Sequence, residues 1–226
     1  AHHPDATATL LKLPDDPNPS ARHRALLALG FVATPAAIQR LDDELCSTSA
    51  RESASGAAAG YALGLLPAAA AQATQARLFN AIVQGSWRRQ RDTLLAVLLG
   101  MLKEGSPRDT APLRRLFDDE SNRDPEVRAM LLRLLLADPR GRGGLDQARL
   151  LERGSDAERH ELLRHLATTD EAPPGTMRDC LAKLAERSAD AALRGAALQV
   201  LGRWRFPEAV ELATAALPSH DATEAA

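Results

Sequence analysis

The sequence predicts an all-α fold, a solenoid of about six helical hairpins, and two observations support this prediction. Leucines recur at intervals of 31 to 36 residues, at Leu29, Leu63, Leu99, Leu135, Leu166 and Leu201. A period in the thirties is typical of stacked helical repeats, because a single hairpin cannot bury its own apolar face. Hydrophobic residues make up 45% of the chain and aromatic residues only 3%, a Leu- and Ala-rich composition that favours helices over strands.

Prolines, glycines and capping residues divide the chain into these hairpins. In the clearest one, Pro17 and Pro19 precede an amphipathic helix, Gly30 acts as its stop, and Pro35 opens the next helix. The first helices of the hairpins are expected at 5–13, 35–46, 68–84, 107–120, 144–152 and 174–187, with a last helix at 207–217. The second helices are expected at 20–32, 50–66, 87–103, 124–137, 156–168 and 190–205.

A single domain is expected over residues 1–217, with a disordered tail over 218–226. The segment 139–144 is interpreted as a linker between repeats, because it lacks the Gly-Lys-Ser/Thr of a phosphate-binding loop and follows a helix. The uncharged stretch 53–76 is rich in Ala and Gly and contains Pro67, so it predicts a helical hairpin rather than a membrane span.

Several second helices begin with the same short motif. It is clearest in Asp124-Pro125-Glu126-Val127-Arg128 and returns in Asp190-Ala191-Ala192-Leu193-Arg194. With the Leu-Gly stretches that follow, these residues resemble the HEAT-repeat family of the armadillo-like superfamily. The resemblance covers about residues 5–217 and is weakest around Gly56 and Asp92. It implies a right-handed α-α superhelix whose second helices line the concave side.

Four arginines occupy one position of the repeat, and these are Arg22, Arg128, Arg159 and Arg194. The resemblance implies a structural role, in which each Arg pairs with an Asp of the adjoining turn and links neighbouring repeats. Asp124 precedes Arg128 and Asp190 precedes Arg194, as this role requires. Contact with a ligand is the alternative.

Charge is unevenly distributed between the two sets of helices. The net charge is −2, but the expected second helices carry 14 basic and 8 acidic residues, and the remainder carries 14 basic and 22 acidic residues. The HEAT resemblance therefore implies a basic concave face, to which Arg88, Arg89, Arg91, Arg203 and Arg205 contribute. Two rows of the repeat supply the candidate partner-binding residues, which are His23, Leu27, Tyr61, Val97, Arg133, His160, Arg164 and Gln199.

Small residues dominate one second helix, from Ala54 to Gly60. They indicate either close helix–helix packing or a shallow recess edged by Tyr61. The acidic runs 42–44 and 118–120 end first helices and are interpreted as a solvated outer face, with an acidic ridge as the alternative. Cys46 and Cys180 lie more than three repeats apart, so they are expected to be free thiols.

No catalytic residue, metal or cofactor is expected. His160 and His165 are five positions apart and diverge around a helix, whereas a zincin needs two His residues four apart. His160-Glu161 is a single His-Glu dipeptide, and the HEAT-like metal hydroxylases carry paired ones. Nothing in the sequence brings a Ser, His and Asp together as a nucleophilic triad.

The predicted function is that of a non-enzymatic scaffold or adaptor, which binds a partner protein or peptide through its concave face. The alternative is binding of nucleic acid or another polyanion along the basic inner helices, although aromatic stacking residues are sparse. A HEAT-like lyase or metal hydroxylase is the third hypothesis. The 25 Arg and 3 Lys indicate a GC-rich, bacterial source. The compartment is cytoplasmic or, if Ala1 follows a removed signal peptide, periplasmic or secreted.

Overall fold

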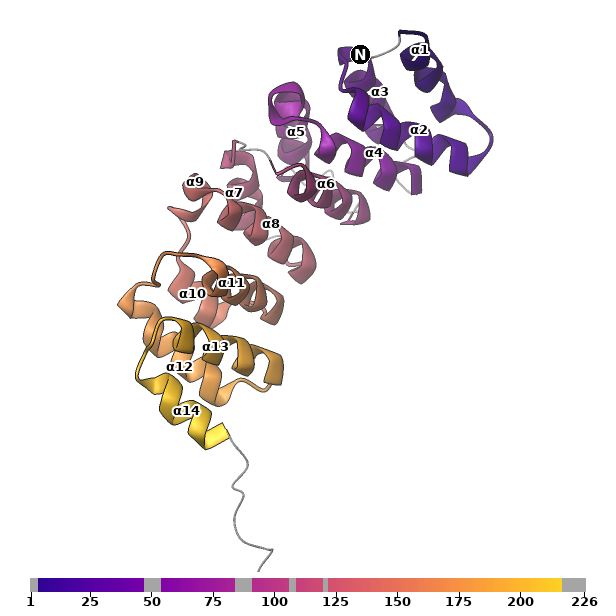
Figure 1. The fold of residues 1–226 in the computed structure, drawn as a ribbon. Helices are drawn as coiled ribbons and strands as arrows, with labels where there is room; N and C mark the ends of the chain where they lie inside the picture. The colour runs from indigo at the N-terminus through magenta and orange to yellow at the C-terminus, as the bar shows by residue number, and fades with distance from the viewer. Residues whose placement is uncertain (1–3, 47–53, 84–90, 106–108, 120–121, 217–226) are drawn as a thin grey trace, which may run out of the picture. The chain divides into compact units, whose positions relative to one another are not determined.

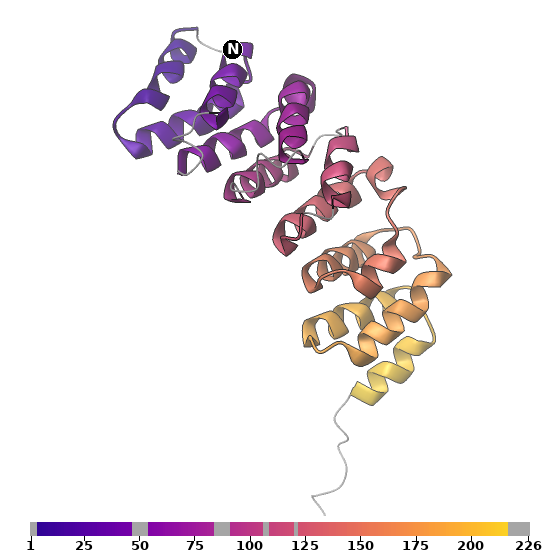
Figure 2. The same cartoon turned by 180° about the vertical axis from the view of Figure 1, so that it is seen from behind.

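The computed structural model describes residues 4–46, 54–83, 91–105, 109–119 and 122–216, and all regular structure in these ranges is helical (Figure 1 and Figure 2). The all-α prediction is therefore confirmed for this part of the chain. The chain divides into two compact units, unit 1 (Ala1–Gly144) and unit 2 (Leu145–Ala226). The superhelix and the single domain over 1–217 stay predictions, and the predicted tail at 218–226 lies outside the described residues.

Unit 1 consists of two layers of helices. Its elements are α1 (Pro4–Lys12), η1 (Leu13–Asp15), α2 (Pro19–Val32), α3 (Pro35–Cys46), α4 (Ala54–Leu65), α5 (Ala68–Val83), α6 (Arg91–Glu104), α7 (Ala111–Asp118), α8 (Pro125–Ala137) and α9 (Pro139–Arg142). In one layer α2, α4, α6 and α8 pack in sequence, and in the other α1, α3, α5 and α7 do so. Leucines such as Leu26, Leu63 and Leu131 are fully buried in this unit.

Unit 2 repeats this arrangement on a smaller scale. Its elements are α10 (Gln147–Arg153), α11 (Asp156–Thr168), η3 (Gly175–Met177), α12 (Arg178–Arg187), α13 (Ala191–Arg203) and α14 (Glu208–Ala216). The pair α11 and α13 forms one layer, and α10, α12 and α14 form the other. Both units thus have the paired-helix order that the sequence predicted, with α2, α4, α6, α8, α11 and α13 as the second helices.

Helix starts follow the capping residues of the sequence. The side chains of Asn18, Asp124 and Asp190 accept backbone N–H groups in the first turns of α2, α8 and α13. Ser155 and Glu158 form a capping box at the start of α11. Among the described helices, none combines the length and the apolar character needed to cross a bilayer.

The leucine period is broken in α6. Five of the six recurring leucines are buried, but Leu99 is 48% exposed. In α6 the buried positions include Val97, Leu98 and Met101 instead. The buried residues of α4 and α6 match when Leu63 is aligned with Met101 rather than with Leu99. The predicted spacing was therefore wrong by two residues at this helix, which turns Leu99 to the surface.

Three glycines lie inside helices at points where neighbouring second helices touch. A Cβ atom on Gly30 would lie 2.8 Å from the carbonyl oxygen of Ala62 in α4. A Cβ on Gly64 would come well within 3.0 Å of the carbonyl oxygen of Val97, and a Cβ on Gly100 equally close to that of Tyr61. The close-packing interpretation of α4 is thus confirmed. Gly30 is not a helix stop, because α2 continues to Val32.

The segment 139–144, interpreted from sequence as a linker, contains the short helix α9. Asp138 accepts the N–H of Arg140 at 2.8 Å and caps this helix. Gly141 is buried, and a Cβ atom there would lie 2.5 Å from the carbonyl oxygen of Leu135 in α8. The glycine therefore lets α9 fold back against α8, which the Gly-rich composition alone did not indicate.

Gly64→Ala is expected to destabilise unit 1 by about 2–3 kcal/mol, because the added methyl group meets backbone rather than a movable side chain. Gly195→Ala in α13 is the matched control, since nothing lies within 4 Å of its Cβ position. That change should instead stabilise the protein by about 0.5–1 kcal/mol through helix propensity. Urea unfolding followed by circular dichroism measures both. Equal stability of the two variants would contradict the close contact of α4 and α6.

Candidate functional site

The candidate surface of unit 1 is the exposed side of its second helices. With α6 in its observed register, the position two residues before each recurring buried residue holds Leu27, Tyr61, Leu99 and Arg133. Leu27 and Tyr61 are half-buried, and Leu99 and Arg133 are exposed. One turn later Phe31 in α2 is 72% exposed.

Backbone contacts bring the apolar members of this surface near one another. Gly30 touches Ala62, which places Phe31 and Tyr61 next to the junction of α2 and α4. Gly100 touches the carbonyl of Tyr61, which places Leu99 next to the junction of α4 and α6. We define the apolar patch as Leu27, Phe31, Tyr61, Leu65 and Leu99. Sequence reasoning missed Phe31, Leu65 and Leu99; the i, i+4 spacing of Phe31 from Leu27 and of Leu65 from Tyr61 was the available signal.

Val97 was predicted as a surface anchor, and this prediction is wrong. The Val97 side chain is fully buried. It packs against Gly60 of α4, where an added Cβ atom would lie 3.2 Å from Cγ2 of Val97. The cause is the two-residue shift in α6, which exchanges the places of Val97 and Leu99. His23, also predicted for this surface, is half-buried in α2 one turn before Leu27.

Many arginines of the second helices are engaged within their own unit. Arg91 donates to Asp124 at 2.5 Å and also pairs with Glu126. Arg164 donates to Glu161. Arg203 donates to the carbonyls of Ala167 at 2.9 Å and Thr169 at 2.8 Å, while Arg88 and Arg89 lie outside the described residues. Arg133 forms no ion pair with any residue that the structure describes. Among the described members of the predicted basic face, Arg91, Arg164 and Arg203 are thus engaged within their own unit, and Arg133 and Arg205 have no ion pair with a described residue.

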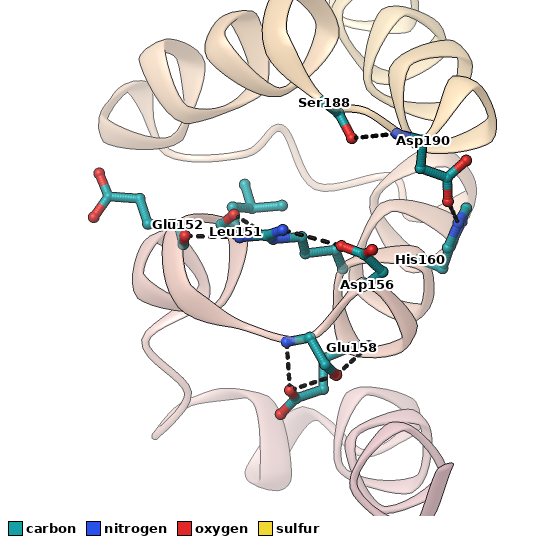
Figure 3. Close-up of polar contacts among 9 residues, drawn as sticks. Leu151, Glu152, Asp156, Glu158, His160, Ser188 and Asp190 are labelled. Atoms are coloured by element: carbon teal, nitrogen blue, oxygen red, sulfur yellow. Dashed lines mark hydrogen bonds and ion pairs between the residues drawn. The ribbon is translucent and has the colours of Figure 1, made fainter. Parts of the chain in front are cut away.

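The four repeat arginines close hairpins. Arg159 donates to the carbonyls of Leu151 at 3.0 Å and Glu152 at 2.8 Å, in the last turn of α10, and to Asp156 at 3.1 Å (Figure 3). Helix C-termini present carbonyls without intrahelical donors, so a guanidinium there satisfies them and complements the helix dipole.

The other repeat arginines also donate to backbone carbonyls at the turn of their own hairpin. Their carbonyl partners are Asp16 and Pro17 for Arg22, Phe117 and Asn122 for Arg128, and Ser188 and Ala189 for Arg194. The arginines are structural as expected, but they bind within their own hairpin rather than between neighbouring repeats, and neither Arg128 nor Arg194 pairs with the Asp that precedes it. Asp124 and Asp190 do not bind these arginines, because their oxygens are directed to the helix start and to the preceding hairpin.

These two capping aspartates link neighbouring hairpins. Asp190 accepts the N–H of Ala192 through Oδ1 at 2.7 Å, and its Oδ2 lies 3.0 Å from Nε2 of His160 (Figure 3). Asp124 caps α8 through Oδ1 and binds Arg91 of α6 through Oδ2. The hydrogen bond with His160 holds the pKa of Asp190 below its ordinary value.

Three predicted residues of unit 2 meet in one groove. His160 and Arg164 of α11 and Gln199 of α13 line a hollow of 400 Å³ whose lining also includes Leu163 and Ala196. His160 is held by Asp190 and Arg164 by Glu161, so the charged groups of this groove are already paired. Unlike the apolar patch of unit 1, the groove combines apolar side chains with these paired charged groups.

The acidic run 42–44 is not a free acidic ridge. Asp42 is buried and pairs with Arg77 of α5, and Glu44 lies 3.7 Å from Arg40. Asp118 pairs with Arg114, and Glu120 lies outside the described residues. Cys46 and Cys180 form no disulfide, as predicted. Within the described ranges, no three His, Cys, Asp or Glu side chains gather closely enough to hold a metal ion.

Neither protein-family models nor curated protein sequences match this chain. The likeness to HEAT repeats therefore rests on the sequence motifs alone.

Arg128→Met is expected to lower the free energy of unfolding by about 1–3 kcal/mol, because it leaves the carbonyls of Phe117 and Asn122 without their donor. Arg133→Met on the same helix should change it by less than about 0.5 kcal/mol, since that side chain is exposed. Chemical unfolding of the two variants tests this. Comparable losses in both would refute the hairpin-closing role.

His160→Ala is expected to raise the pKa of Asp190 toward its ordinary value. A carboxylate whose pKa is lower in the folded than in the unfolded state stabilises the fold at pH values above its unfolded-state pKa. This stabilisation is lost as the pH falls through the folded-state pKa. The variant should therefore have a smaller contribution of this kind, and its stability should fall less than that of the wild type as the pH is lowered. Carboxyl NMR titration measures the shift, with Glu208, whose pKa is lowered by Arg178, as internal reference. An unmoved Asp190 would show that the contact with His160 is not maintained in solution.

Proposed function

We propose that this protein is a non-enzymatic scaffold that holds a partner protein against the second helices of unit 1. The observation that carries the proposal is the apolar patch. The whole chain has only seven aromatic residues, and two of them, Phe31 and Tyr61, belong to this patch. Exposed aromatic and aliphatic side chains that gather on one face are typical of protein-binding surfaces, where such residues supply most of the binding energy.

The partner that fits this surface is an amphipathic segment with an acidic residue at one end. Its apolar side would cover Leu27, Tyr61 and Leu99, which follow one another across α2, α4 and α6. The next helix in the layer, α8, presents the exposed guanidinium of Arg133, and Lys103 is exposed at the end of α6. A carboxylate of the partner placed there would set the direction in which the segment binds.

A HEAT-like superhelix is part of the proposal, since repeated hairpins present equivalent positions in a row. Binding of nucleic acid or another polyanion has less support. Polyanion affinity depends on cations that can neutralise phosphates, and Arg91, Arg164 and Arg203 already bind groups of their own unit.

Leu99→Ser combined with Tyr61→Ser is expected to reduce binding of the native partner at least about tenfold, because the change removes the centre of the patch. The partner is first identified by a photocrosslinker at position 99 in the source organism, and its affinity is then measured with purified proteins. Val210→Ser is the matched control, since Val210 is also 72% exposed but lies on α14 in unit 2. Equal loss in the control, or no loss in the double variant, would contradict the assignment. An affinity that falls steeply with salt and is retained by the double variant would favour the polyanion alternative.

A further inference from the structure

A cavity of 680 Å³ lies among α5, α6, α7, α8 and α9 in unit 1. Its floor is apolar and comprises Met101, Leu113 and Leu134, each of which is buried. Cavities of 300 to 1,000 Å³ with apolar walls and a few polar groups are typical of small-molecule sites. This cavity is distinct from the apolar patch, because none of the patch residues lines it.

One wall of the cavity comes from a departure from the repeat pattern. Helix α9 follows α8 directly and was not predicted from the sequence, which indicated only a linker there. Its residues Pro139 and Arg140 line the cavity. The fold-back of α9 depends on Gly141. A Cβ atom at this position would clash with the carbonyl oxygen of Leu135. The wall that α9 contributes therefore depends on this glycine.

The polar rim favours a cation. Asp109 accepts the N–H of Ala111 through Oδ1, and Asp138 accepts that of Arg140 through Oδ1. The second oxygen of each carboxylate makes no hydrogen bond or ion pair with any described residue. The C-terminal turns of α6 and α8 also line the cavity, and helix C-termini carry partial negative charge. Arg140 is the opposing positive group, and its residue is exposed at the rim.

We propose that this cavity binds a small organic ammonium compound, whose apolar body rests on Met101, Leu113 and Leu134 and whose charged nitrogen lies between Asp109 and Asp138. A bound ammonium group would be attracted to both carboxylates and could donate to a free oxygen. The apolar floor would remove the rest of the ligand from water. The site does not depend on the partner-binding function of the patch.

Isothermal titration calorimetry of the full chain with three matched probes tests the proposal at neutral pH. The probes are 4-phenylbutylamine, 4-phenylbutan-1-ol and 4-phenylbutyrate, which share an apolar body and differ in charge. The amine is expected to bind at least about tenfold more tightly than the alcohol, and the carboxylate more weakly still.

Asp109→Asn with Asp138→Asn should bring the affinity for the amine down to that for the alcohol. Asn caps helices as well as Asp does, so the fold is retained. Asp118→Asn, at the far end of α7, is the charge-matched control and should leave the affinity unchanged. Ala137→Trp should abolish binding of both probes, because Ala137 is exposed and lines the cavity, which the indole would fill.

Three results would overturn the proposal. They are equal affinity for the amine and the alcohol, amine binding that survives the double Asn variant, and amine binding that survives Ala137→Trp. Absence of any amine binding by the wild type would overturn it as well. None of these results bears on the apolar patch, whose test uses a protein partner.

Discussion

The close approach of α4 and α6 is the contact on which the candidate surface of unit 1 depends. Gly64 and Gly100 have no side chains, so the two helices meet backbone to backbone. This contact fixes the rotation of α6 about its own axis, because any other rotation would place a side chain between the helices. Val97 and Met101 then face the core and Leu99 faces outward. The apolar patch follows from packing, since exposure of Leu99 is the consequence of burying its neighbours.

Polar side chains then connect the helices within each hairpin and link neighbouring hairpins. Each repeat arginine satisfies carbonyls at the turn of its own hairpin, and each of Asp124 and Asp190 uses one oxygen for its helix and the other for the preceding hairpin. The arginine of the motif thus stabilises its own hairpin, and the aspartate links that hairpin to the preceding one. These contacts hold the repeat arginines and Arg91 within their own unit.

Unit 1 presents two surfaces of different character. The patch is broad, apolar and spread over α2, α4 and α6, as a protein partner requires. The cavity by α9 opens to solvent, has an apolar floor and two carboxylates with an oxygen available, and suits a small molecule. The groove of unit 2 differs from both, because its charged side chains are already paired.

The sequence by itself determined the helical class, the order of the hairpins and the starts of the capped helices α2, α8, α11 and α13, because caps, prolines and apolar spacing act within a few residues. It also identified Leu27, Tyr61 and Arg133 as surface positions. Only the tertiary structure decided that Leu99 rather than Val97 is exposed, that Arg128 binds carbonyls, and that α9 walls a cavity. Helix rotation and hydrogen-bond partners depend on residues far apart in the chain, which local patterns do not encode.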